Sequence, residues 1–313
     1  MIEYVDRLLQ GDRRSAAKII TLIENDGADK PEVMRRIYPN TGKAYVLGIT
    51  GSPGAGKSSL VDEITKQIRA ENFKVGIIAV DPTSPFSGGA LLGDRIRMQE
   101  HALDRGVFIR SMGTRGSLGG LASATKDVVK VLDAYGCDIV IIETVGVGQS
   151  ELDIMHYADT TLVVLTPGAG DHIQTIKAGI MEIADIFVIN KADLGGTEKM
   201  ITDIEGMLDL SPLLKGWRPP VMATSTLDGK NISNLWETIK KHRRHMIDTG
   251  TYREAAEKRL RLEVTEIIQR KLMEIIEKDL LSNGKMSSLT EKLVNREIDP
   301  YAAAGDLLKK FLP

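Results

Sequence analysis

A glycine-rich segment at residues 51–58, which reads GSPGAGKS, constrains the fold of this chain more than any other feature. It fits the pattern GxxxxGK[ST], follows the apolar run Tyr45–Ile49 and precedes a helical pattern. Glycines let backbone amides turn toward a phosphate, and the following helix presents its N-terminus to the anion. Strand, loop and helix together predict a phosphate-binding P-loop; the alternative is a chance match in an unrelated loop.

Nine consecutive residues of this segment are expected to contact a nucleotide. Lys57 would place its charge near the β- and γ-phosphates, and Ser58 would ligate Mg²⁺. The full set is Gly51, Ser52, Pro53, Gly54, Ala55, Gly56, Lys57, Ser58 and Ser59.

Short aliphatic runs alternate with helical stretches from about residue 44 onward. Near-continuous apolar strands separated by helices predict an α/β fold, with a mostly parallel sheet flanked by helices. A helix from Ile232 to Ile247 would close this domain. The expected strands are Tyr45–Ile49, Val75–Val80, Val107–Ile109, Asp138–Ile142, Thr161–Leu165 and Ile186–Ile189, with Val221–Ala223 as a last addition.

The segments before and after the alternating strands and helices show only helical periodicity, so we predict that the chain has three parts. Residues 1–43 would form an N-terminal helical arm, 44–250 the P-loop domain, and 251–313 a C-terminal helical extension. The Asn283-Gly284 pair is expected to break the long C-terminal helix. Either the extension packs on a partner or on its own copy, or its helix covers the main domain.

Composition narrows the function classes. Lys and Arg number 41 against 43 Asp and Glu, a formal charge of −2, which argues against a generally basic nucleic-acid binder. The single cysteine, Cys137, excludes an internal disulfide and a multi-cysteine metal site. No run approaches the ~20 apolar residues of a membrane span. We therefore expect a cytoplasmic protein that binds neither nucleic acid nor membrane.

The tetrapeptide Asn190-Lys191-Ala192-Asp193 follows an expected strand and reads as NKxD. The Asp193 carboxylate offers two acceptors for guanine N1–H and its exocyclic amine, a donor pair that adenine lacks. Asn190 would brace the loop, and the Lys191 stem would cover the base. The alternative is a charged turn. Thr224, Ser225 and Thr226, after the last strand, are weaker candidates for a further backbone contact to the base.

Carboxylates that follow strands are candidates for the metal site. Asp81 ends one strand, and Glu143 follows another where a Walker B carboxylate would contact Mg²⁺. Asp94 would bind Mg²⁺, and Arg97 would neutralise transition-state charge. Gly146 would meet the γ-phosphate. The alternatives are a turn or N-cap role for Asp81, a helix cap for Asp94 and a solvated Arg97.

A further glycine-rich loop after Thr161–Leu165 carries Lys177, which either reaches the nucleotide or only starts a helix. His242 and His245 share one helical face and are expected to be exposed. The residues expected to carry the reaction are Lys57, Asp94, Arg97, Glu143 and Lys177.

The motif series resembles one family. GSPGAGKSS, DPTSPFSGG, LLGDRIRM, ETVGVGQSE, PGAGD and NKAD occur in the order found in MeaB/ArgK-type GTPases of the G3E group, which include bacterial MeaB and human MMAA. The resemblance covers most of the chain.

The resemblance implies a Mg²⁺-dependent GTPase that converts GTP to GDP. It further implies a homodimer, built through the C-terminal helices, that acts as chaperone of an adenosylcobalamin-dependent mutase, most often methylmalonyl-CoA mutase. Carried onto this chain, Ser58, Asp81, Asp94 and Glu143 would surround the metal. The family also carries an older label, an ATPase or kinase of arginine/ornithine transport. A metal-insertion GTPase and a non-enzymatic scaffold that only binds nucleotide are further alternatives.

Overall fold

The computed structural model describes residues 1–81, 101, 103–113, 120–144, 150–167, 178–210, 216–282 and 285–308. Within these residues the chain divides into two compact units, Met1–Arg253 and Glu254–Pro313. No helix of the described part is both long and apolar enough to cross a membrane.

The first unit is built on a seven-stranded sheet in which each strand runs parallel to its neighbours. Its strand order is β3-β2-β4-β1-β5-β6-β7, so the chain crosses over between strands through helices. All seven expected strands are confirmed. They are β1 (Tyr45–Gly51), β2 (Val75–Asp81), β3 (Val107–Gly113), β4 (Ile139–Glu143), β5 (Thr160–Leu165), β6 (Ile186–Ile189) and β7 (Val221–Ala223).

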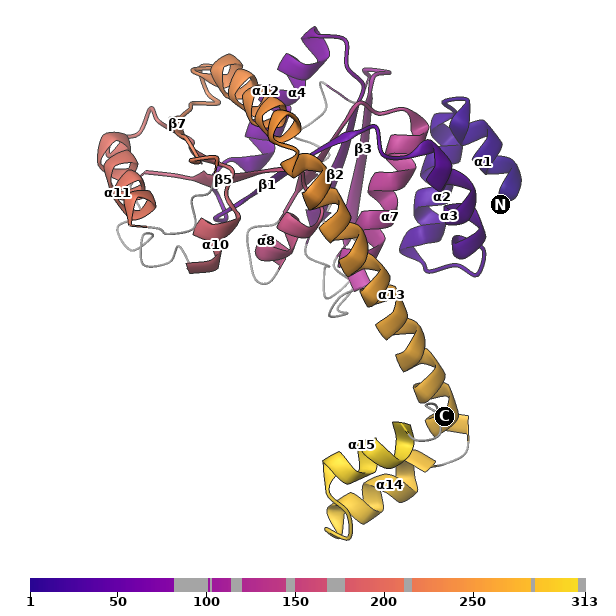
Figure 1. Cartoon of the computed structure of the whole chain (residues 1–313). Helices are drawn as coiled ribbons and strands as arrows, with labels where there is room; N and C mark the ends of the chain where they lie inside the picture. The colour runs from indigo at the N-terminus through magenta and orange to yellow at the C-terminus, as the bar shows by residue number, and fades with distance from the viewer. Residues whose placement is uncertain are drawn as a thin grey trace. The chain divides into compact units, whose positions relative to one another are not determined.

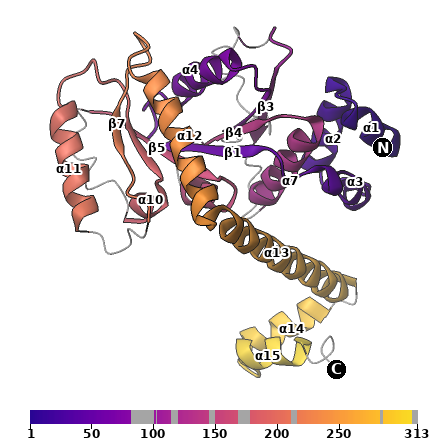
Figure 2. The same ribbon diagram turned by 45° about the horizontal axis from the view of Figure 1, so that its top comes forward.

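Helices cover both faces of this sheet (Figure 1). Along β1, Leu47 packs with α4 and α12, whereas Val46 packs with α1, α2, α3 and α7, because successive side chains of a strand point to opposite faces. Figure 2 shows α7 beside the N-terminal helices. The helices are α1 (Ile2–Leu9), α2 (Arg13–Glu24), α3 (Lys30–Ile37), α4 (Lys57–Ala70), α7 (Gly120–Tyr135), α8 (Ser150–Asp153), α10 (Ala178–Ile183), α11 (Thr197–Asp209) and α12 (Ile232–Thr249), with 3₁₀ turns η1 (Tyr38–Asn40) and η2 (Ile154–His156).

The N-terminal helices share a core with the sheet rather than forming a separate body. An ion pair fixes α3 to α7: the Lys30 ammonium lies 3.1 Å from Asp127 Oδ2, and Asp26 Oδ1, in the turn before α3, lies 3.1 Å from the same ammonium. Arg13 donates from Nη1 to the Val107 carbonyl at 2.7 Å, which ties α2 to β3. The arm therefore belongs to the first unit.

A buried hydrogen-bonded chain joins α12 to the amino ends of β1 and β5. His242 Nδ1 lies 2.6 Å from Thr160 Oγ1, and the Tyr45 hydroxyl bonds the same Thr160 oxygen. The Trp217 ring packs against the His242 ring, with centroids 4.8 Å apart and planes tilted by 56°, and Trp217 donates from Nε1 to the Asp185 carbonyl at 2.8 Å. His242 is only 3% exposed, so the expectation that it faces solvent is wrong: Trp217 and the sheet cover its face of α12.

Burial shifts the pKa values of two side chains in this hydrogen-bonded series, His242 and Tyr45. It lowers the pKa of His242 to about 4, with the nearby His245 as a second cause, even though Asp185 Oδ1 lies 3.5 Å from Nε2. Burial also raises the pKa of Tyr45. Both side chains are therefore neutral at pH 7.

The second unit is helical and has little interior of its own. It holds most of α13 (Thr251–Ser282), together with α14 (Lys285–Val294) and α15 (Pro300–Leu308). Among its described side chains only Ala303 is buried. Five apolar side chains of α13 recur at helical spacing and are 43–55% exposed: Leu260, Val264, Ile268, Leu272 and Ile275.

Candidate nucleotide site

The glycine-rich loop joins β1 to α4 and depends on backbone conformations that only glycine adopts at low cost. Gly51, Gly54 and Gly56 have φ of +138°, +75° and +83°. A Cβ at Gly51 would lie 2.0 Å from the Val164 carbonyl oxygen on β5. The loop therefore passes so close to the neighbouring strand that no side chain fits there.

Lys57, the first residue of α4, is buried beneath this loop. Its ammonium donates to the carbonyl oxygens of Gly51 at 2.8 Å and Ser52 at 3.0 Å. These bonds hold the positive charge at the N-terminus of α4, where the helix dipole also favours an anion. The arrangement provides a cradle of positive potential for phosphate oxygens.

Ser58 and Glu143 meet where β1 and β4 end. Ser58 Oγ donates to Glu143 Oε1 at 2.6 Å, and Glu143 is 4% exposed. A hydroxyl and a carboxylate oxygen brought together beside the phosphate loop are ligands of the type that Mg²⁺ prefers. The donor chemistry of this pair therefore fits the metal implied by the family resemblance.

The remaining expected metal ligands are placed only in part. Asp81 ends β2, two residues beyond Ala79, which pairs in register with Glu143, so its backbone lies at the same end of the sheet. The side chain of Asp81 lies outside the described part. Asp94, Arg97, Gly146 and Lys177 lie outside the described residues altogether.

The expected base loop follows β6 and is braced from two sides. Asn190 is fully buried; its Nδ2 donates to the Ala55 carbonyl at 2.9 Å, and its Oδ1 accepts from Thr224 Oγ1 at 3.3 Å. Lys191 adopts a positive φ of +59°, which turns the chain sharply after the strand. The base loop and the phosphate loop are thus joined by one side chain.

Asp193 lies at the exposed tip of this turn. One of its oxygens, Oδ1, accepts from Ser225 Oγ at 2.9 Å, which orients the carboxylate. Ser225 is itself buried, and its backbone pairs with Lys230. A fixed, exposed carboxylate at this position is suited to accepting two hydrogen bonds from a ligand.

These groups lie at one edge of the parallel sheet. Gly51, Glu143, Asn190 and Thr224 occupy the carboxyl ends of β1, β4, β6 and β7, or follow them directly. In open α/β sheets this edge is where ligands bind. The separate motifs therefore lie together at this edge and form one candidate site.

A sequence profile described as "Methylmalonyl Co-A mutase-associated GTPase MeaB" matches residues 16–280. The chain belongs to the MeaB family of GTPases. This confirms the resemblance drawn from the motifs.

Individual relatives and a solved structure agree with the family assignment. A Pyrococcus abyssi protein that carries a provisional GTPase name is 51% identical, over 99% of this chain and 96% of its own. The mouse mitochondrial "Methylmalonic aciduria type A homolog" is 31% identical, over 98% and 80%. The solved "LAO/AO transport system kinase" has a TM-score of 0.72 at 26% identity, over 100% and 97%.

Some contacts of this MeaB-family site were not expected from the sequence. Thr144 Oγ1 donates to Thr50 Oγ1 at 2.9 Å, linking the residues that follow β4 and end β1. The Thr224 side chain bonds Asn190, whereas the sequence predicted only a backbone contact to the base from the segment that Thr224 begins. The only sequence feature that points to these hydrogen bonds is that threonines stand at the ends of the expected strands.

Proposed function

We propose that this MeaB-family GTPase hydrolyses GTP with Mg²⁺ at the described site and acts as a chaperone of an adenosylcobalamin-dependent acyl-CoA mutase. The observation that carries the nucleotide assignment is the braced base loop. Asn190 fixes it to the phosphate loop through Ala55, and Ser225 fixes the Asp193 carboxylate at its tip. The mutase partner, methylmalonyl-CoA mutase above others, is supported by the description of the family.

Guanine selectivity follows from the chemistry of Asp193. Its carboxylate accepts hydrogen bonds from N1–H and the exocyclic amine of guanine. Adenine has no donor pair at these positions, so an adenine nucleotide would leave the carboxylate partly unsatisfied. Lys191 would cover the base with its aliphatic stem.

Hydrolysis requires water to attack the γ-phosphate, and the protein contributes mainly position and charge. Lys57 holds its charge at the phosphates, and Ser58 with Glu143 would hold Mg²⁺, joined by Asp81 and Asp94. Bound Mg²⁺ supplies charge neutralisation on the phosphate oxygens. Arg97 and Lys177 are proposed to stabilise the transition state, and the Gly146 amide to sense the γ-phosphate.

We also propose a homodimer formed through residues 251–313. The exposed face of α13 that begins at Leu260 supports it. Apolar side chains at this density along one helical face are typical of a helix that packs on another protein surface.

The proposal is tested by GTP turnover of the full chain, alone and with the adenosylcobalamin-dependent mutase of the same source. We expect slow intrinsic hydrolysis that the mutase stimulates several-fold, because a switch protein needs a persistent triphosphate state. Lys57→Ala, measured in parallel, reports any contaminating activity.

ATP provides the decisive comparison. Stimulation with GTP and none with ATP supports the chaperone role. ATP turnover equal to GTP turnover would contradict the base assignment and favour a transport-linked kinase, the role for which the solved relative is named. GTP turnover that the mutase leaves unchanged would retain the GTPase and remove the proposed partner.

A further inference from the structure

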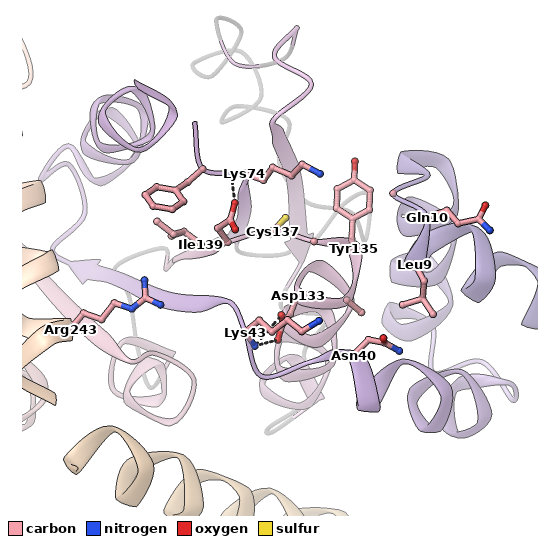
Figure 3. A pocket seen from close by; sticks show the side chains of 15 residues that line it. Leu9, Gln10, Asn40, Lys43, Lys74, Asp133, Tyr135, Cys137, Ile139 and Arg243 are labelled. Carbon is pink, nitrogen blue, oxygen red and sulfur yellow. Dashed lines mark hydrogen bonds between the residues drawn. The ribbon is translucent and has the colours of Figure 1, made fainter. Parts of the chain in front are cut away.

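A cavity of about 500 Å³ opens at the amino ends of β1, β2 and β4, at the opposite end of these strands from the phosphate loop. Segments from five places in the first unit line it: the end of α1, the loops before β1 and β2, the turn between α7 and β4, and α12. Figure 3 shows these segments converging around it. Its volume is in the range of small-molecule sites.

Three cationic side chains line this cavity. Lys43 and Lys74 extend from the loops before β1 and β2, and Arg243 reaches in from α12 (Figure 3). Arg243 lies over the Tyr45 ring, 4.8 Å from its centroid. In the part of the chain that the structure describes, no carboxylate forms an ion pair with any of the three. Their charges are thus available to a ligand.

The two carboxylates in the lining are engaged in building the walls. Asp133 accepts hydrogen bonds from the backbone amides of Gly42, Lys43 and Ala44. Asp138 accepts from the backbone amide of Lys74 at 2.7 Å. Each carboxylate therefore positions a loop that carries a lysine, and the formal charge of the lining is +1.

The rest of the lining is apolar or neutral. Leu9 and Phe73 are exposed apolar side chains at the rim, and Ile139 forms part of the wall. Cys137 is buried, which raises the pKa of its thiol to about 12, so it is a neutral wall group at pH 7. Among the described residues no cluster of metal-binding side chains occurs. This favours an organic anion over a metal ion.

We propose that this cavity binds a small organic anion, with a phosphate or carboxylate head attracted by the cationic side chains of the lining, Lys43 and Lys74, and an apolar body against its apolar groups, Phe73 or Leu9. Charge-assisted hydrogen bonds from an ammonium group favour such a head. Arg243 adds a cation on the side of α12. The site is separate from the nucleotide site and does not depend on its assignment.

The experiment titrates phenyl phosphate and 3-phenylpropionate into the full chain saturated with GDP and Mg²⁺, so that the nucleotide site is filled. Ligand-observed NMR or calorimetry reports binding, and 2-phenylethanol serves as the neutral control. We expect a Kd on the order of 1 mM for at least one anion, which suits a ligand of this size. The tighter of the two probes identifies phosphate or carboxylate as the preferred head.

Matched variants assign the binding to the cavity. Lys43→Gln combined with Lys74→Gln should raise the Kd about tenfold or more, since both charged donors are lost. Lys241→Gln, at an exposed position of α12 outside the cavity, should change the Kd less than about twofold. Arg243→Gln should weaken binding more than Arg244→Gln, its exposed neighbour. Circular dichroism checks that each variant is folded.

Three results would overturn the proposal. One is no binding of either anion up to about 10 mM, well above the expected Kd. Another is equal binding of 2-phenylethanol, which would show that the charge of the head is irrelevant. The third is equal weakening by Lys241→Gln and the cavity variant, which would show diffuse attraction to the surface of the protein.

Discussion

The buried cluster of Tyr45, Thr160 and His242 and the loops that carry the candidate nucleotide site use polar side chains in opposite ways. At the amino end, Tyr45, Thr160 and His242 bond one another in a buried chain, and Trp217 covers them. At the carboxyl end, the polar side chains brace loops. Asn190, for example, fixes the base loop to the phosphate loop.

This difference distinguishes polar side chains that stabilise the fold from polar side chains that are available to contact a ligand. A polar group inside the sheet–helix interface must find its partner within the chain, since burial without one is costly. A polar group on a loop beyond the strand can be oriented by one hydrogen bond and still offer its other acceptor sites to a ligand, as Asp193 does. Substitutions of polar side chains that face the nucleotide should therefore lower turnover most, and substitutions within the buried cluster of Tyr45, Thr160 and His242 should lower stability.

The largest effect is expected for Lys57→Ala. Removing the buried ammonium should lower GTP turnover by about 100-fold or more, because the charge aimed at the phosphates is lost. Steady-state phosphate release measures this. Lys66→Ala on the same helix should leave turnover unchanged; if it fell equally, the assignment of Lys57 would fail.

Gly51→Ala should destabilise the fold by about 3 kcal/mol or more, because the added Cβ meets the Val164 carbonyl and a positive φ is forced on alanine. Gly54 also has a positive φ, +75°, but a Cβ there would meet nothing within 4 Å, so Gly54→Ala should cost about 1 kcal/mol. Urea unfolding compares the two. Equal losses would contradict the close approach of the loop to β5.

The buried His242 at the amino end of the sheet predicts that the free energy of unfolding falls at acid pH. The pKa of His242 is about 4 in the folded protein and 6.5 in the unfolded chain, so its neutral form is favoured by folding. The contribution of neutral His242 to the free energy of unfolding is at its maximum above pH 6.5. It falls by about 3 kcal/mol as the pH drops to 4, because only the unfolded chain takes up the proton. Urea unfolding across this range should be less pH-dependent in His242→Gln; an unchanged slope would refute the shift.

The smallest effect is expected for Trp217→Phe. The ring contact with His242 is largely kept, while the 2.8 Å hydrogen bond to the Asp185 carbonyl is lost, at a cost of about 1 kcal/mol. Thermal or urea unfolding measures the loss, and turnover should not change. Lower turnover at full stability would mean that the amino end contributes to the reaction.

Much of the fold could be predicted from the sequence because it depends on local patterns. Each strand is a short aliphatic run, and a sheet buried on both faces needs such runs, so Ile186–Ile189 is recognisable alone. The P-loop and NKxD segments are contiguous motifs whose chemistry is fixed by residue type. Their common edge follows from parallel strand topology.

Contacts between distant segments could not be predicted in this way. His242 pairs with Thr160, which is 82 positions earlier, and no periodicity marks that pairing. The cavity at the amino ends draws on Lys43, Lys74 and Arg243, which the sequence gives no reason to group. Such sites arise from packing, and a lone lysine in a loop has no local signature.

Because Asn190 donates a hydrogen bond to the Ala55 carbonyl, the phosphate loop and the base loop depend on each other's sequence. A Cβ at Gly56 would lie 2.4 Å from Asn190 Nδ2, so the glycine and the asparagine constrain each other across 134 positions of chain. A side chain at position 56 would therefore need a smaller residue at position 190. Redesigning this protein for another base therefore means exchanging both loops together.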